Sequence, residues 1–297
     1  MAGGKGIIIA GIIISCTGLL ISGISAKKAY DDFKAIDVDA KDMQTGTIKL
    51  NDISKLNVEV DSGTCYIRHS TTSESYIDYS VSKIYDTNIY DKEDNEIKLT
   101  LKRRYKFMMP WIWILPTVQE NKSKIEVYLT DKDYDAYLEL NAGKMYLEGD
   151  YSFSSLTVDV SAGTFTSSGN ITADNLKYKV SAGDLISHSN VTVTNDANVK
   201  ISAGDMSIDY LEAKSIKIDV SAGDIDAKVK SDTIKFGVSA GDLDLTIVGA
   251  LADYKTDIDK SAGSCNLSKE DRHKTSGTKS LDGNISAGDA DIIFVES

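Results

Sequence analysis

A tripeptide of small residues, most often Ser-Ala-Gly, recurs through the second half of this 297-residue chain. Its glycines follow one another at intervals of 18 to 25 residues, and they are Gly143, Gly163, Gly183, Gly204, Gly223, Gly241, Gly263 and Gly288. Self-similarity at such a short and regular period is typical of stacked repeat proteins. Each repeat therefore has to be interpreted as one layer of a larger structure.

Apolar and polar residues alternate on both sides of each repeat glycine. Before Gly163, for example, the apolar positions are Leu156, Val158 and Val160, and after it Phe165 is apolar. Strict alternation is typical of half-buried β-strands, so each repeat is expected to hold two strands that meet at a corner formed by the tripeptide. The corner glycine is expected to adopt a positive φ and to let the next layer pack closely above it.

One repeat alone buries too few apolar side chains to offset the entropy lost on ordering it, so stacking is obligatory. We therefore predict an all-β protein, a parallel β-solenoid with rungs of about 20 residues. Its domain is expected to span residues 50–297, because the same alternation fits residues 56–67 with Ser62-Gly63 as the corner. The alternative is an antiparallel meander in which each tripeptide forms a hairpin tip.

Composition and charge limit the ligands and the cysteine pairing that can be expected. The net charge of −12 argues against nucleic acid as a ligand, because its phosphates would be repelled. Three cysteines provide no disulfide framework. Cys65 and Cys265 both occupy inward positions many rungs apart, so we expect two buried thiols.

The amino-terminal region holds an uncharged apolar stretch. After a short tail at residues 1–5, residues 6–25 carry no charge and are flanked by Lys5 and by Lys27-Lys28. As a helix this stretch spans about 30 Å, the thickness of a bilayer core, which predicts a single-pass membrane anchor. Three alternatives remain open: a cleaved signal peptide, a lipoprotein processing box around Cys16, and a buried helix. Residues 26–49 are expected to form a linker and a first strand.

A second unusual segment covers residues 102–123. It contains both tryptophans, both prolines and two of the four arginines of the chain. One interpretation is a hydrophobic cap over the first rung. The other is a tip that contacts a membrane surface or a partner, since aromatic and basic residues gather at bilayer interfaces. The expected contact residues are Lys102, Arg103, Arg104, Lys106, Phe107, Trp111 and Trp113.

Charged residues recur at outward positions and predict two stripes. Lysines before the corners give a partly basic stripe, namely Lys177, Lys179, Lys200, Lys217 and Lys235. Aspartates after the corners give an acidic stripe, namely Asp184, Asp205, Asp224, Asp226, Asp242, Asp244, Asp289 and Asp291. The acidic stripe is expected either to accept hydrogen bonds from corner amides or to attract a cation or a basic partner. A calcium site is an alternative, although no known calcium-binding loop is present.

Catalytic signals are weak. His69, His188 and His273 show no metal-ligand spacing, and the chain has neither a phosphate-binding loop nor a nucleophile elbow. Paired aspartates of the acidic stripe are the only candidates for a glycan-cleaving enzyme. Because the same aspartate recurs in rung after rung, and a catalytic site breaks a repeat at one place, we expect no enzyme. No cofactor is expected and no metal site is assigned.

The repeated Val-Ser-Ala-Gly-Asp-Leu/Ile unit, the alternating strands before it and the closing stretch at residues 277–289 resemble the putative adhesin family. The resemblance covers roughly residues 50–297. It implies a bacterial domain of unknown function, built as a β-solenoid and often tethered to the envelope by an amino-terminal helix. The apolar segment at 102–123 departs from the polar loop usual in that family.

The family has no catalytic residues to carry over to this chain. The resemblance implies an extracytoplasmic surface protein linked to adhesion or envelope stress. We therefore expect a non-enzymatic, membrane-anchored binding or scaffold module of the cell envelope. We expect a single-pass protein whose solenoid lies outside the cytoplasm and binds a surface ligand that the sequence does not identify.

Overall fold

The computed structural model describes residues 43–50, 52–82, 85–86, 91–93, 96–103 and 123–296. The chain divides into two compact units, Met1–Met43 and Gln44–Ser297, and the second contains nearly all of the described residues. The predicted membrane anchor at residues 6–25 lies outside them. Within the described part, no helix has both the length and the apolar character needed to cross a membrane.

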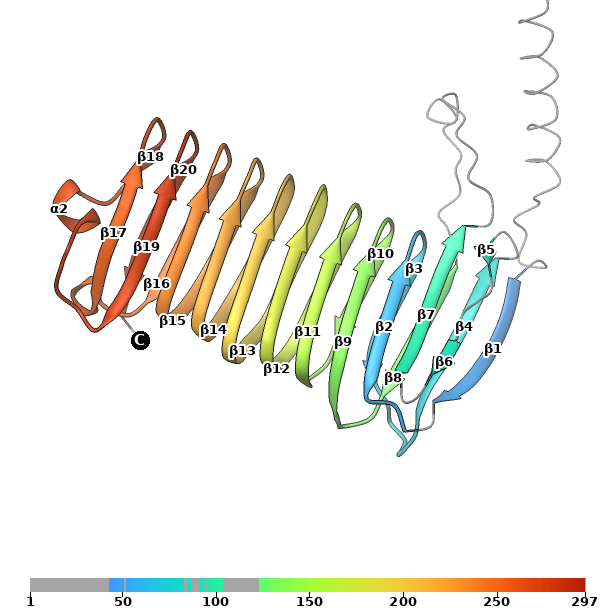
Figure 1. Cartoon of the computed structure of the whole chain (residues 1–297). Coiled ribbons are helices and arrows are strands. Elements are labelled where there is room, and N and C mark those ends of the chain that lie inside the picture. The colour runs from blue at the N-terminus through green and yellow to red at the C-terminus, as the bar shows by residue number, and fades with distance from the viewer. Residues whose placement is uncertain are drawn as a thin grey trace, which may run out of the picture. The chain divides into compact units, whose positions relative to one another are not determined.

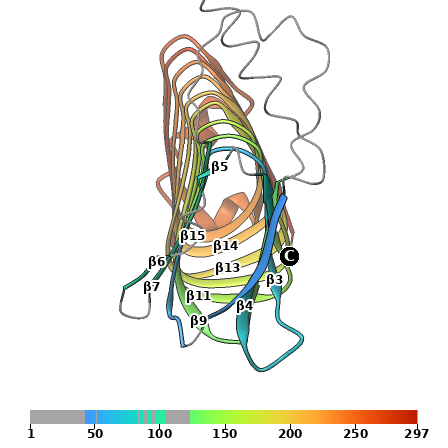
Figure 2. The ribbon, with the colours of Figure 1, turned by 90° about the vertical axis from the view of Figure 1, so that its right-hand side faces the viewer.

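The middle of the second unit is a stack of parallel strands in which each chain segment pairs with the next one along the sequence (Figure 1). Its strands are β9 (Asp133–Leu140), β10 (Lys144–Glu148), β11 (Tyr151–Val160), β12 (Thr164–Val180), β13 (Gly183–Ile201), β14 (Gly204–Val220), β15 (Asp224–Val238) and β16 (Asp242–Val248). The predicted parallel stack is confirmed, and the antiparallel meander is wrong for these rungs. Seen along the stack in Figure 2, the rungs superpose as a flattened coil.

Equivalent positions of successive rungs lie in register, so the core is built from columns. One column runs through the residues seven before each corner glycine, and it contains Leu156, Leu176, Ala197, Ile216 and Ile234. All five side chains are buried. The alternation seen in the sequence is thus the alternation between core and solvent, because successive strand residues point to opposite faces.

The corners show why glycine recurs. A Cβ atom added at any of the eight repeat glycines would collide with the carbonyl oxygen of the corner glycine in the adjacent rung. The predicted positive φ is found at only three of the eight, Gly143, Gly163 and Gly204. Close approach between rungs is therefore the requirement that all corners share, and the left-handed backbone conformation is needed only at some of them.

At the carboxyl-terminal end, the order of the rungs in the stack differs from their order in the sequence. Its elements are η3 (Leu251–Asp253), β17 (Tyr254–Lys260), β18 (Ser264–Cys265), α2 (Lys269–Arg272), β19 (Lys279–Ile285) and β20 (Asp289–Val295). Strand β19 pairs with both β15 and β17, and β20 pairs with both β16 and β18. The last rung of the sequence is therefore inserted between two earlier ones, and β17 and β18 form the terminal rung (Figure 1).

At the amino-terminal end, too, the order of the rungs in the stack differs from their order in the sequence. Strands β2 (Lys55–Val60) and β3 (Thr64–His69) form a rung that pairs on one side with β9 and β10 and on the other with β7 (Glu96–Arg103) and β8 (Lys124–Leu129). This rung contains the Ser62-Gly63 corner that the alternation of residues 56–67 predicts. Three antiparallel strands cover this end, namely β4 (Ser75–Ser82), β5 (Tyr85–Asp86) and β6 (Asp91–Glu93). Strand β1 (Met43–Leu50) pairs with β4.

The two described cysteines differ in burial. Cys65 is fully buried, and burial raises the pKa of its thiol to about 12. Cys265 is only half-buried because β18 belongs to the terminal rung, so the prediction of two buried thiols is wrong for Cys265. Both cysteines are free.

Candidate binding surface

The strands that follow the corners share one outer face, which we call the post-corner face. It consists of the outward side chains of residues 64–68, 124–128, 144–148, 164–168, 184–188, 205–209, 224–228, 242–246 and 289–293. Because the rungs are in register, each outward position forms a column with a spacing of about 4.8 Å. The two ends of this face carry different chemistry.

The carboxyl-terminal half of the post-corner face carries eight aspartates in two adjacent columns, which we call the aspartate ladder. One column, one residue after each corner, contains Asp184, Asp205, Asp224, Asp242 and Asp289. The other, three residues after each corner, contains Asp226, Asp244 and Asp291. The structure therefore places the sequence-predicted acidic residues directly above one another on five rungs.

The ladder carboxylates have few partners. Within the described ranges none of the eight forms an ion pair. Asp289 accepts a hydrogen bond from the amide of Ser264 at 2.9 Å, and Asp184 accepts one from the hydroxyl of Thr164 at 3.5 Å. Corner amides thus hold one aspartate of the ladder, Asp289. Six of the others are exposed, and together with the half-buried Asp184 they form a concentrated negative charge.

This concentration of carboxylates contributes to a raised pKa in the middle of the ladder. The pKa of Asp244 lies above the usual aspartate range, first because of partial desolvation and then because of Asp291, Asp226 and Asp242 nearby. Like charges in close columns disfavour the ionised form. A bound cation or a basic partner would relieve this repulsion.

The amino-terminal half of the same face carries an aromatic cluster, the tyrosine-arginine patch, formed by Tyr66, Arg68, Tyr128 and Tyr146 together with Tyr76 of the adjoining strand β4. The rings of Tyr66 and Tyr146 stack with centroids 4.9 Å apart, and those of Tyr76 and Tyr128 stack at 4.5 Å. The guanidinium carbon of Arg68 lies 4.3 Å from the centroid of the Tyr66 ring. This patch was not predicted from the sequence, because the site prediction rested on charged residues. Tyr66 and Tyr146 nevertheless both stand three residues after a corner glycine.

The charges of the patch are balanced. Arg68 donates to Glu148 Oε2 at 2.7 Å and also pairs with Glu126. The hydrogen bond to Glu148 is the main reason that the pKa of Arg68 lies above its usual value. This half of the face is therefore nearly neutral locally, in contrast to the aspartate ladder.

The predicted basic stripe on the strands before the corners is also partly neutralised. Lys179 pairs with Asp159 at 2.8 Å, and Lys217 pairs with Asp219 at 2.8 Å. Both acidic partners lie on the same outer face as the lysines. This face therefore offers less uncompensated charge than the ladder.

The apolar segment at residues 102–123 replaces a corner. Leu101 pairs in register with Val60 and Lys124 pairs with Thr64, so the segment stands where the neighbouring rung has only residues 61–63. Of the predicted contact residues, Lys102 and Arg103 lie on β7, where they pair with β5. The other five, Arg104, Lys106, Phe107, Trp111 and Trp113, lie outside the described residues.

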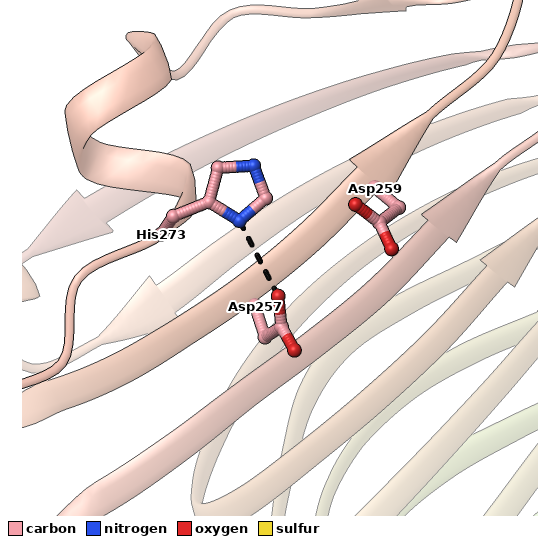
Figure 3. Close-up of side chains that lie close together, drawn as sticks. All are labelled: Asp257, Asp259 and His273. Carbon is pink, nitrogen blue, oxygen red and sulfur yellow. Dashed lines mark hydrogen bonds and ion pairs between the residues drawn. The ribbon is translucent and has the colours of Figure 1, made fainter.

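Each of the three histidines lies beside an aspartate. The closest nitrogen–oxygen distances are 3.2 Å for His69 and Asp131, 3.1 Å for His188 and Asp209, and 3.3 Å for His273 and Asp257. At His273 a second carboxylate, from Asp259, joins the group (Figure 3). Sequence spacing did not reveal this group, because α2 and the turn after it bring His273 back to β17.

A parallel stack with repeated outward columns defines a β-solenoid repeat protein. The chain belongs to the Toastrack DUF4097 family, whose model matches residues 53–294. The resemblance to the putative adhesin family inferred from the repeats is confirmed. No curated protein matches the sequence significantly.

Several solved structures are similar to this chain. A putative adhesin from Bacteroides fragilis shares 14% identity over 85% of this chain and 98% of its own, with a TM-score of 0.43. A putative lipid binding protein from Parabacteroides distasonis shares 11% identity over 85% and 97%, with a TM-score of 0.45. A putative cell adhesion protein from Clostridium sporogenes shares 15% identity over 86% and 99%, with a TM-score of 0.26.

Proposed function

We propose that this protein is a non-enzymatic binding module of the bacterial cell envelope that uses the aspartate ladder to hold an extended basic partner. The observation that carries the proposal is the alignment of eight aspartates, seven of them exposed and Asp184 half-buried, in two columns without ion pairs to described residues. A linear array of equal charges is complementary to a partner with positive charges along its length.

The repetition of the ladder also favours binding over catalysis. A glycan-cleaving enzyme needs one acid and one base or nucleophile whose environments differ. Here the pair Asp224 and Asp226 is repeated in the next rung as Asp242 and Asp244. Turnover of a cell-wall glycan that disappears in Asp224→Asn or Asp242→Asn would instead support the enzyme alternative.

The basic partner can be represented by a decalysine peptide, whose binding to the full chain in detergent is measured by calorimetry. A variant with Asp224, Asp226, Asp242 and Asp244 all changed to Asn should bind at least about tenfold more weakly, since four exposed charge pairs contribute roughly 0.3–1 kcal/mol each. The loss should shrink as salt is added.

A matched control removes the same charge elsewhere. Four exposed aspartates off the ladder, Asp174, Asp196, Asp232 and Asp253, are changed to Asn in the control. Its affinity for decalysine should fall by less than about threefold, because these residues are not in the ladder columns. Equal weakening in both variants would show that only net charge matters and would overturn the proposal.

We further propose that residues 6–25 anchor the protein in the membrane and that the segment 102–123 touches the bilayer surface. The composition of both segments supports this, and so does the position of the second one, which replaces a corner at one end of the stack. An anchor at residues 6–25 would place the ladder close to the envelope components it binds.

The two tryptophans make this membrane proposal testable, because both lie in the segment 102–123. With the full chain reconstituted in anionic vesicles, brominated lipids should quench the tryptophan fluorescence, and aqueous iodide should quench it weakly. Protease added to intact cells should digest the solenoid. Efficient iodide quenching, or a solenoid that protease reaches only after lysis, would contradict the respective part of the proposal.

A further inference from the structure

We propose that Asp257, Asp259 and His273 form a binding site for a divalent transition-metal ion, with Zn²⁺ as its representative. The three residues lie at the end of the stack, on the terminal strand β17 and just after α2 (Figure 3). This site is separate from the aspartate ladder and does not depend on the proposed function.

The ligand atoms are close to the spacing that a metal requires. Asp257 and Asp259 are two residues apart on β17 and both are exposed, so their carboxylates share its outward face. His273 Nδ1 lies 3.3 Å from Asp257 Oδ1, and one ligand atom from each residue lies within 4.8 Å of the others. Two ligands of a tetrahedral zinc ion are about 3.4 Å apart, given bond lengths of about 2.0–2.1 Å. Rotation of the exposed Asp259 side chain supplies the remaining approach.

The backbone that carries His273 is fixed to β17. The hydroxyl of Thr256, the residue before Asp257, donates to the carbonyl of Asp271 at 2.6 Å and accepts from the amide of Lys274 at 2.9 Å. The ammonium group of Lys274 donates to the carbonyls of Ala252 and Tyr254 at 2.8 and 2.9 Å. Because residues on both sides of His273 are held, the imidazole is already positioned against the two carboxylates before any ion binds.

The other two histidine-aspartate pairs lack this arrangement. His69–Asp131 and His188–Asp209 have similar distances. Among the described residues, however, only the group at His273 brings a third ligand within reach. The pair formed by His188 is therefore a natural control within the same chain.

The donor set indicates the class of metal. One imidazole nitrogen with two carboxylates suits zinc and other first-row transition metals, whereas calcium and magnesium prefer oxygen ligands alone. Asp257, Asp259 and His273 are all exposed, so the remaining coordination positions are open to water. Because a carboxylate only accepts, Nδ1 carries a proton when it bonds to Asp257. On metal binding this proton is released to solvent or moves to Nε2, and Nδ1 donates its lone pair to the ion.

The bound ion would fasten the open end of the solenoid. Within the described ranges β17 pairs with one strand only, β19, so it is the outermost strand of its sheet face. An ion held by β17 and His273 links this strand to the segment that folds back over it. Metal binding should therefore slow hydrogen exchange in residues 254–274 more than in the middle of the stack.

The test uses the tag-free full chain in detergent, stripped of metal and titrated with Zn²⁺ by calorimetry. We expect one zinc ion per chain at this site. His273→Ala and Asp259→Asn should each weaken zinc binding by about tenfold or more, since even outer-shell changes cost about 10- to 100-fold. His188→Ala should leave the affinity unchanged. Circular dichroism checks that each variant retains its strand content.

Cobalt gives a second readout. Bound Co²⁺ should show absorption bands of a nitrogen- and oxygen-ligated ion in the wild type and in His188→Ala, and these bands should be lost in His273→Ala. Zinc affinity unchanged in both His273→Ala and Asp259→Asn would overturn the proposal, as would equal weakening in His188→Ala or the absence of zinc binding by the wild type.

Discussion

The two halves of the post-corner face are built on the same backbone and carry opposite chemistry. In the amino-terminal half, the tyrosine-arginine patch stacks its rings and neutralises its charges. In the carboxyl-terminal half, the aspartate ladder repeats one charge on five rungs. The difference shows that stacking constrains the inward side chains, whereas the outward columns are free to carry a function.

The two halves also differ in what they contribute to stability. Stacked aromatic pairs stabilise by about 0.5–1.5 kcal/mol beyond the area they bury. Aspartates in adjacent rungs repel each other by roughly 1 kcal/mol in water. The patch is therefore explained by stability, but the ladder opposes stability, which is why we assign the binding role to the ladder.

The largest loss of stability is expected from substitutions at the corner glycines, which belong to the backbone that the two halves share. Gly143→Ala and Gly223→Ala each place a methyl group against the carbonyl oxygen of a neighbouring corner. Denaturant unfolding should show a loss of about 3 kcal/mol at Gly223, the upper end of the usual overpacking cost, because the colliding atom belongs to the backbone. The loss at Gly143 should be about 1 kcal/mol larger, because its φ of +100° adds strain for alanine.

A glycine outside the corners provides the control for this test. A Cβ at Gly237, on β15, would have Asp219 Oδ1 as its nearest neighbour at 3.5 Å, an ordinary contact. Gly237→Ala should therefore change the free energy of unfolding by less than about 0.5 kcal/mol. A loss at Gly237 as large as that at the corners would disprove the close-approach explanation.

A smaller loss of stability is expected when the ion pairs of the tyrosine-arginine patch are removed. Arg68→Met removes the cation shared by Glu126 and Glu148 and leaves two partly buried carboxylates near each other. The expected loss is about 1–3 kcal/mol in the free energy of unfolding. In the control Lys49→Met, the lost ion pair to Glu74 has exposed fractions of 70% and 59%, so the change should be below about 0.5 kcal/mol. Equal losses would mean that the patch adds nothing beyond a surface ion pair.

The repeat period was enough to predict the strands, their parallel pairing and the columns. It predicted the register of the ladder because a fixed offset from each glycine becomes a column once the rungs stack. The order of the rungs at the ends was not predictable, because the repeat pattern shows that a segment forms a rung but not which neighbour it stacks on. Only the pairing of β19 with both β15 and β17 decides the order.

Some of the site residues could be predicted from the sequence and others could not. The ladder repeats in the sequence and was found there. The patch depends on contacts between β3, β4, β8 and β10, most of which are distant in the sequence, and on ring stacking that the positions of charged residues do not reveal. The group at His273 depends on one helical turn that reverses the chain, so the interval of 14 residues between Asp259 and His273 carried no signal.

The smallest effect tests whether the ladder is under electrostatic strain. The pKa of Asp244 is raised in the folded protein, so the folded state binds a proton at a higher pH than the unfolded chain does. The destabilising contribution of the Asp244 charge should therefore disappear as the pH falls from neutral through the raised pKa of Asp244, and return as the pH rises. Asp244→Asn removes the charge permanently and should stabilise the protein at neutral pH by about 1 kcal/mol or less.

Two dependences distinguish this strain from a local packing change. The gain in Asp244→Asn should shrink as the pH is lowered, because the wild-type carboxyl is then protonated as well, and it should shrink in high salt because the ladder charges are screened. Asp174→Asn, which removes an exposed charge off the ladder, should show neither trend. Thermal unfolding across pH and salt measures both, and a gain that is independent of pH would mean that the neighbouring aspartates do not repel one another measurably. In that case the two halves of the face would differ in composition but not in energy.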